Sequence, residues 1–176
     1  MKALSGFRLL LLGLWLGSAV FFIAVAQIVF ANLPTRELAG NIVGRALAVL
    51  NYAGIGVSLI GVLTSLVVPN GVRVIVLWAE RVLLVILGIG CAVSQFVISW
   101  WMLMLRTQMG RPIEEVAADD PLRLQFDQLH QYSEWLLLAA MAAALLSFVI
   151  IAFRSAPAAA KRDAIDNLDF QKQFKI

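Results

Sequence analysis

Residues 9–31, LLLLGLWLGSAVFFIAVAQIVFA, decide the fold, because this stretch contains no charged side chain. A predominantly apolar run of about 20 residues is long enough to cross the hydrocarbon core of a bilayer as one helix. Backbone N–H and C=O groups have no water to bind at that depth, so the run must form a helix that pairs its own backbone. The sequence therefore predicts a membrane-spanning helix here.

The rest of the chain repeats this pattern. Hydrophobic residues make up 61% of the 176 residues and charged residues 14%, and the mean hydropathy is +0.88. These values are typical of an integral membrane protein. We expect an all-α four-transmembrane-helix bundle in one domain over residues 1–155, followed by a polar cytoplasmic tail over 156–176. The expected spans cover about 9–31, 43–68, 82–105 and 133–153.

Two of the helices are expected to extend beyond the bilayer. Glu80 and Arg81 precede the third apolar run, so its helix begins before the membrane does. Asp120 followed by Pro121 is a helix-start signal, with the aspartate as N-cap and the proline in the first helical position. No breaker follows until about Phe153, so the fourth helix begins several turns before its span.

The first apolar run has a second interpretation. Lys2 and Arg8 precede it and Ala24-Val25-Ala26 resembles a cleavage site, as in a secretory signal peptide. The run before Ala26 exceeds the roughly 7–15 apolar residues of such peptides, which favours a retained first span.

Small residues recur at helical spacing in the first three runs. Such residues allow two helices to approach closely in lipid. The expected helix-packing residues are Gly13, Gly17, Gly54, Ser58, Gly61, Gly88 and Gly90. Packing inside the bundle is the favoured interpretation, and a homodimer face at Gly13 and Gly17 is the alternative.

The distribution of Lys and Arg predicts the orientation. With four spans, more of these residues fall on the side of the two termini than on the other side. The positive-inside rule then places both termini in the cytoplasm, and the predicted location is the bacterial inner membrane. The net charge of +3 reflects this bias and gives no reason to expect nucleic acid as a partner.

Six polar side chains within the apolar runs or at their outer ends fall in the outer half of the predicted membrane. Polar groups in lipid need partners, so helices tend to turn them inward. The sequence predicts a candidate polar pocket formed by Gln27, Asn51, Gln95, His130, Ser133 and Glu134. The alternative is that these side chains form interhelical hydrogen bonds of about 0.6 kcal/mol each and nothing more.

His130 is the only histidine. Phe126, Leu129, His130 and Ser133 share helical spacing, so we expect His130 to point into the bundle. Glu134 could partner His130 at i, i+4, or it could face water. The imidazole could titrate near neutral pH or ligate a metal or haem, although an interface hydrogen bond is the favoured role.

The sequence carries no catalytic signature. Cys91 is the only cysteine, and no paired histidines, phosphate-binding loop, nucleophile elbow or CxxC motif is present. Met102 and Met104 do not share a helical face with each other, which argues against a copper site with His130. We expect no metal, no cofactor and no enzymatic activity.

Two segments carry a resemblance to a known family. Residues 22–44, FIAVAQIVFANLPTRELAGNIVG, and residues 126–133, FDQLHQYS, resemble the transmembrane protein 205-like family, a four-span domain of unknown function. Gln27 stands where that family has a proline, and Leu137 lies near a position that is often asparagine. The resemblance implies a multi-pass membrane protein and supplies no reaction or ligand.

Two classes of function follow from these patterns. The first is a small membrane protein that handles a solute or ion through the outer-half pocket. The second is an accessory or assembly subunit, whose partners would be the lipid bilayer and either copies of itself or a larger membrane complex.

Overall fold

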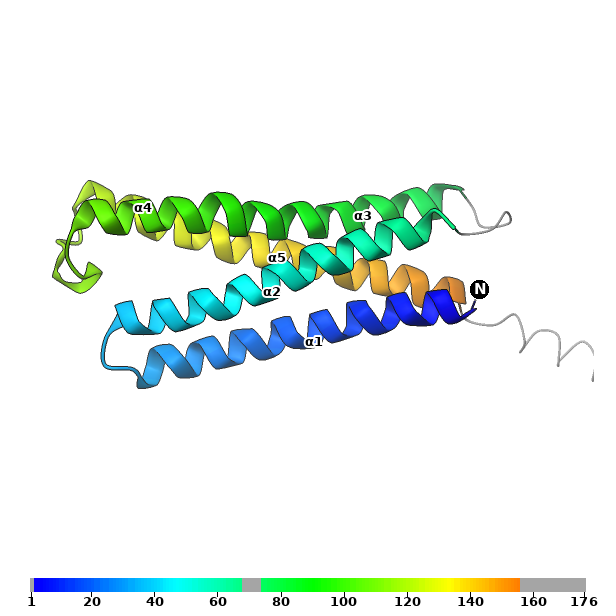
Figure 1. Ribbon diagram of the computed structural model, residues 1–176, viewed down its shortest axis with the longest axis horizontal. Helices are drawn as coiled ribbons and strands as arrows, with labels where there is room; N and C mark the ends of the chain where they lie inside the picture. The colour runs from blue at the N-terminus through cyan, green and yellow to red at the C-terminus, as the bar shows by residue number, and fades with distance from the viewer. Residues whose placement is uncertain (1, 68–73, 156–176) are drawn as a thin grey trace, which may run out of the picture.

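The computed structural model describes residues 2–67 and 74–155, which form long helices joined by short connections. The elements are α1 (Lys2–Asn32), α2 (Arg36–Ser65), α3 (Val74–Ala92), the π-helix η1 (Val93–Ile98), α4 (Ser99–Met109), the 3-10 helix η2 (Ile113–Glu115) and α5 (Pro121–Ser155). In Figure 1, α3, η1 and α4 form one continuous rod. The expected tail over 156–176 lies outside the described residues.

The all-α four-helix membrane architecture is confirmed. Four helical segments are long and apolar enough to cross a membrane: Leu4–Asn32, Arg36–Ser65, Val74–Met109 and Pro121–Arg154. The third has 36 residues and the fourth 34. Since roughly 20 residues cross the hydrocarbon core, both must extend beyond it. Asp120 caps α5 by accepting a hydrogen bond from the Leu122 N–H at 2.8 Å.

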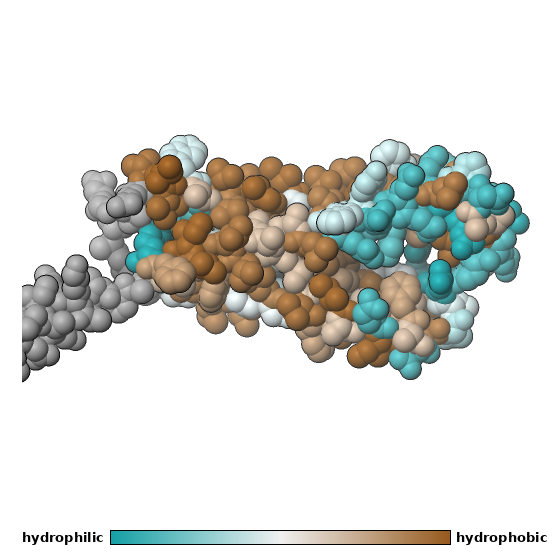
Figure 2. All heavy atoms as spheres, turned by 180° about the vertical axis from the view of Figure 1, so that it is seen from behind, coloured by the Kyte–Doolittle hydropathy of each residue, from teal (hydrophilic) through white to brown (hydrophobic). Residues whose placement is uncertain are grey.

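The two ends of the bundle differ in composition. We call the end with the N-terminus and the end of α5 the terminal end, and the end with the α1–α2 and α4–α5 connections the loop end (Figure 1). Apolar side chains cover the middle of the molecule, and polar ones gather at the loop end (Figure 2). This is the distribution expected of a membrane-spanning bundle.

The core of the membrane-spanning part draws on all four spans. It is formed by Leu12, Trp15, Ala19, Leu50, Leu84, Leu87, Cys91, Ala140, Ala143, Ala144 and Ile151. Small residues bring the helices together. A Cβ atom added to Gly61 would lie 3.0 Å from Leu84 Cδ2, and one added to Gly90 would lie 3.6 Å from Ala140 Cβ. The Ser58 hydroxyl donates to the Leu84 carbonyl at 2.7 Å across the α2–α3 contact.

A second apolar cluster lies at the loop end and contains no residue of α1 or α2. Its buried members are Ile98, Leu105, Phe126 and Leu129. Here α4 and the first turns of α5 pack on each other as a pair. Polar contacts link this pair to α2: Arg106 donates to Asn41 Oδ1 at 2.8 Å, and Glu114 accepts from the α2 N-terminus.

Candidate functional site

The structure does not bring the six predicted pocket residues together. Asn51 is buried and its Nδ2 donates to the Ser94 hydroxyl at 3.2 Å, which links α2 to η1. Gln95 is half-buried, and its Oε1 is enclosed with no hydrogen-bond partner in the part of the chain that the structure describes. Gln27, in contrast, is exposed on the outer face of α1. Of the predicted pocket residues in the membrane, only Asn51 thus forms an interhelical hydrogen bond among the described residues, and it joins α2 to the π-helix.

The expectation that His130 points into the bundle is wrong. Its side chain is 50% exposed and lies 3.4 Å from the carboxylate of Glu134, which is 65% exposed. Phe126, Leu129 and Ser133 are the buried residues of this stripe. Successive residues on an α-helix are about 100° apart, so when Leu129 faces α4 the next residue is turned toward the surface. The i, i+4 partnership with Glu134 does form, on that surface.

A different cluster of polar groups is buried at the terminal end. Glu80 of α3 is fully buried and receives two guanidinium groups, one on each carboxylate oxygen. Arg8 of α1 donates to Oε1, and Arg154 of α5 donates to Oε2 at 2.6 Å. Arg8 is 2% exposed and Arg154 13%. The cluster Arg8–Glu80–Arg154 therefore ties three helices through one carboxylate.

This cluster lies near one boundary of the hydrocarbon core. Roughly 20 residues span the core, and that length counted from Glu80 along the α3–α4 rod reaches Trp100. The same length counted back from Arg154 along α5 ends beside Trp135. Both tryptophans are exposed, as expected for rings at a membrane interface. The cluster and the tryptophans therefore mark opposite boundaries, and His130 lies beyond the second one.

The sequence did not predict this cluster, because its three members stand beside three different apolar runs and each was interpreted only as the end of its own helix. A signal was nevertheless present. Arg8, Glu80 and Arg154 each stand at the edge of an apolar run on the same side of the predicted membrane. A carboxylate at the edge of a bundle next to arginines at the same depth is expected to pair with them. Counting depth on all helices together would have indicated the contact.

The cluster joins three helices through ion pairs that use both oxygens of one carboxylate. Both carboxylate oxygens of Glu80 are occupied by guanidinium groups, so the carboxylate has no free oxygen aimed at a substrate. Among the described residues, no three His, Cys, Asp or Glu side chains form a group that could hold a metal ion. Two guanidinium groups against one carboxylate leave a surplus positive charge.

The loop end carries a separate set of polar contacts outside the membrane. Glu114 of η2 accepts hydrogen bonds from the backbone N–H groups of Arg36 and, at 3.2 Å, Glu37. These donors belong to the first turn of α2, whose N-cap is Thr35. The carboxylate therefore supplies acceptors that a helix N-terminus lacks. Its own backbone N–H and those of Arg36 and Glu37 hold the pKa of the Glu114 carboxyl below its usual value.

We expect Glu114→Gln to lower stability at neutral pH and to have less effect in acid. A carboxyl whose pKa is lowered in the folded state contributes stability above its unfolded pKa, and this contribution is lost as the pH falls through the folded pKa. Unfolding of both proteins in detergent, measured between pH 7 and acid, checks this. Glu115→Gln is the matched control, because Glu115 is exposed and its side chain makes no hydrogen bond among the described residues. Parallel pH profiles of the Glu114→Gln and wild-type proteins would contradict the assignment.

By its fold, the chain is a four-span membrane protein. It has a buried Arg–Glu–Arg cluster at one boundary and a two-helix extension at the other. A family model described as a domain of unknown function, DUF4149, matches residues 10–111, which is more than half of the chain. The chain therefore belongs to the DUF4149 family. No curated protein and no solved structure matches it.

Proposed function

We propose that this protein is a non-enzymatic accessory subunit that packs through α1 against another membrane chain, either a second copy of itself or a subunit of a larger complex. The observation that supports this proposal is a stripe of residues on the outer face of α1, spaced alternately three and four positions apart. Its members are Gly6, Leu10, Gly13, Gly17, Val20, Ala24, Gln27 and Ala31. All of them except the half-buried Gly13 are exposed.

The chemistry of this α1 stripe supports a helix partner. Small residues on one face let a second helix approach until backbone atoms touch, and a heptad-like spacing keeps that face toward the partner. A Cβ atom added to Gly17 would meet nothing within 4 Å. Gln27 presents an amide outward near the bilayer boundary, where an interhelical hydrogen bond would satisfy it.

The α1 proposal is preferred to solute handling because of where the polar groups lie. Gln27 and His130 are exposed on the outside of the bundle, and Asn51 is already bonded to Ser94. Handling of a small solute or ion is the second candidate, favoured by the enclosed Gln95 Oε1, which has no hydrogen-bond partner among the described residues. A Gln95→Leu variant with unchanged solute-resistance and uptake phenotypes would count against that candidate.

Gly17→Leu is expected to weaken association in the membrane without lowering stability. The leucine side chain would stand on the open face of α1, where an added Cβ atom meets nothing within 4 Å, so it separates the partner helix without crowding the bundle at its Cβ. Chemical cross-linking in native membranes, followed by mild-detergent purification and mass measurement, checks this. Ala139→Leu is the matched control, since Ala139 is exposed on α5. Recovery of the wild-type protein only as a free monomer would contradict the proposal.

We further propose that both termini face the cytoplasm of a bacterial cell and that the membrane is the inner one. The excess of Lys and Arg in the sequence segments assigned to the same side as the two termini supports this orientation. A reporter that is active only outside the cytoplasm, fused after Ile176, should be inactive, and activity there would reverse the assignment. We also propose that the chain is related to the transmembrane protein 205-like family, because residues 22–44 and 126–133 resemble that family.

A further inference from the structure

The Arg8–Glu80–Arg154 cluster has more hydrogen-bond donors than its single carboxylate can accept. Each oxygen of Glu80 receives one guanidinium nitrogen, Nη1 of Arg8 on Oε1 and Nη1 of Arg154 on Oε2. The Nε of Arg8 is buried and has no hydrogen-bond partner among residues 2–67 and 74–155. An unpaired buried N–H on a charged group is costly, because it has left water and gained no acceptor. A second anion at this cluster would supply the missing acceptor and balance the surplus charge.

The position of the cluster favours an anion that is part of a lipid. The cluster lies at a boundary of the hydrocarbon core, where the phosphates of one leaflet are found. Arg154 is its most accessible member, at 13% exposure. Large apolar side chains on the same helices, Phe7, Trp78 and Phe153, are exposed around this end. A ligand that approaches Arg154 would therefore meet apolar surface and cationic groups together.

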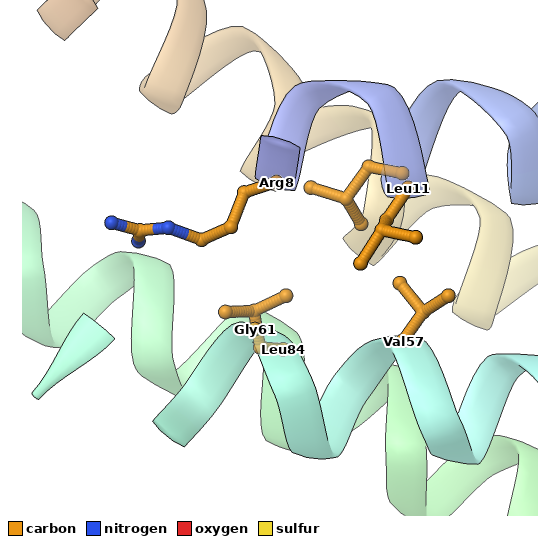
Figure 3. A pocket seen from close by; sticks show the side chains of 6 residues that line it. Arg8, Leu11, Val57, Gly61 and Leu84 are labelled. Carbon is orange, nitrogen blue, oxygen red and sulfur yellow. The ribbon is translucent and has the colours of Figure 1, made fainter. Parts of the chain in front are cut away.

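An apolar depression lies beside Arg8, between α1, α2 and α3. It is lined by Arg8, Leu11, Leu12, Val57, Gly61 and Leu84. Figure 3 shows the apolar stem of Arg8 at its edge, with the guanidinium extending away from Leu11 and Val57. The depression has no enclosed space for a water molecule, so it is not a solute cavity. The stem of Arg8 is thus packed among apolar side chains, while its guanidinium reaches Glu80.

We propose that Arg8 and Arg154 together bind the phosphate of an anionic phospholipid in the leaflet at the terminal end. Guanidinium groups match phosphate oxygens through paired N–H donors, and these charge-assisted hydrogen bonds are stronger than neutral ones. Basic pockets between membrane helices bind anionic headgroups in the same way. Glu80 positions the two arginines, because it holds one guanidinium on each carboxylate oxygen.

The test compares phosphatidylglycerol with phosphatidylcholine on the purified full-length protein. Native mass spectrometry of the detergent-solubilised protein, titrated with each lipid, should show preferential retention of phosphatidylglycerol. Arg154→Gln preserves the neutral Arg8–Glu80 pair and should reduce phosphatidylglycerol affinity roughly fivefold or more, since each basic residue near a lipid headgroup contributes about 1 kcal/mol. Arg111→Gln, an equal charge change on an exposed residue at the loop end, should leave affinity unchanged.

Three results would overturn the proposal. One is equal retention of the two lipids by the wild-type protein, which needs no variant and so does not depend on how Arg154→Gln folds. Another is an equal loss of affinity in Arg154→Gln and Arg111→Gln. The third is displacement of phosphatidylglycerol by millimolar inorganic phosphate, which would identify a site for a free anion in place of a lipid.

Discussion

Replacing Glu80 by glutamine should lower the free energy of unfolding by about 3–5 kcal/mol, the cost of removing one partner from a buried ion pair. Glu80 is fully buried and accepts from both Arg8 and Arg154. Without the carboxylate, two guanidinium groups from different helices would face each other with no anion between them. Thermal or SDS-titrated unfolding in detergent micelles measures the loss.

Glu134→Gln is the control for Glu80→Gln, because it makes the same chemical change on a carboxylate that is 65% exposed. Its effect should stay within about 0.5 kcal/mol, as for most surface substitutions. A triple variant in which Arg8, Glu80 and Arg154 are all replaced by apolar residues of similar size should recover much of the loss, since it leaves no unpaired charge. Equal losses in the Glu80→Gln and Glu134→Gln variants would show that the cluster does not hold the helices.

Gly54→Ala should destabilise the bundle by about 1–3 kcal/mol, the usual cost of overpacking a close contact. An added Cβ atom would lie 2.5 Å from Cys91 Sγ and 2.8 Å from Trp15 Nε1. The Trp15 ring cannot move freely, since its Nε1 donates to the Leu50 carbonyl at 3.0 Å. Unfolding in detergent and the fluorescence of the buried tryptophan both report the change.

Gly56→Ala is the matched control, because a Cβ atom there meets nothing within 4 Å. This variant should be neutral or more stable, since alanine is a better helix former than glycine by about 1 kcal/mol. Adding Cys91→Ala to Gly54→Ala should restore part of the loss by removing the sulfur. If Gly54→Ala and Gly56→Ala behave alike, the close approach of α1, α2 and α3 is not a constraint on stability.

The candidate site was predictable only in part, because the sequence indicates how deep a residue lies in the membrane but not how its helix is rotated about its own axis. The sequence indicated that Asn51 and Gln95 lie inside the membrane, because depth depends only on counting residues along a helix. It did not determine which way each side chain points. His130 shares its helical spacing with both buried and exposed neighbours, so a small rotation of α5 decides between bundle and surface.

The π-helix η1 is another feature that the sequence pattern did not reveal. Its hydrogen bonds join residues five apart, which changes the direction of the side chains that follow. At its end the Ser99 hydroxyl donates to the Ser94 carbonyl at 2.9 Å. The Asn51–Ser94 contact occurs at this point, whereas the prediction paired Asn51 with a pocket that included Gln27 and His130. Regular α-helical periodicity cannot locate such a contact.

The sequence by itself determined the membrane location, the number of spans and the start of the last helix at Pro121, because each depends on local composition and length. Tertiary structure decided which polar groups meet. Arg8, Glu80 and Arg154 are far apart in the chain, and only the packing of α1, α3 and α5 places two guanidinium groups on one carboxylate. Residue type and depth are properties of one helix, whereas a contact depends on the rotation of every helix that contributes to it.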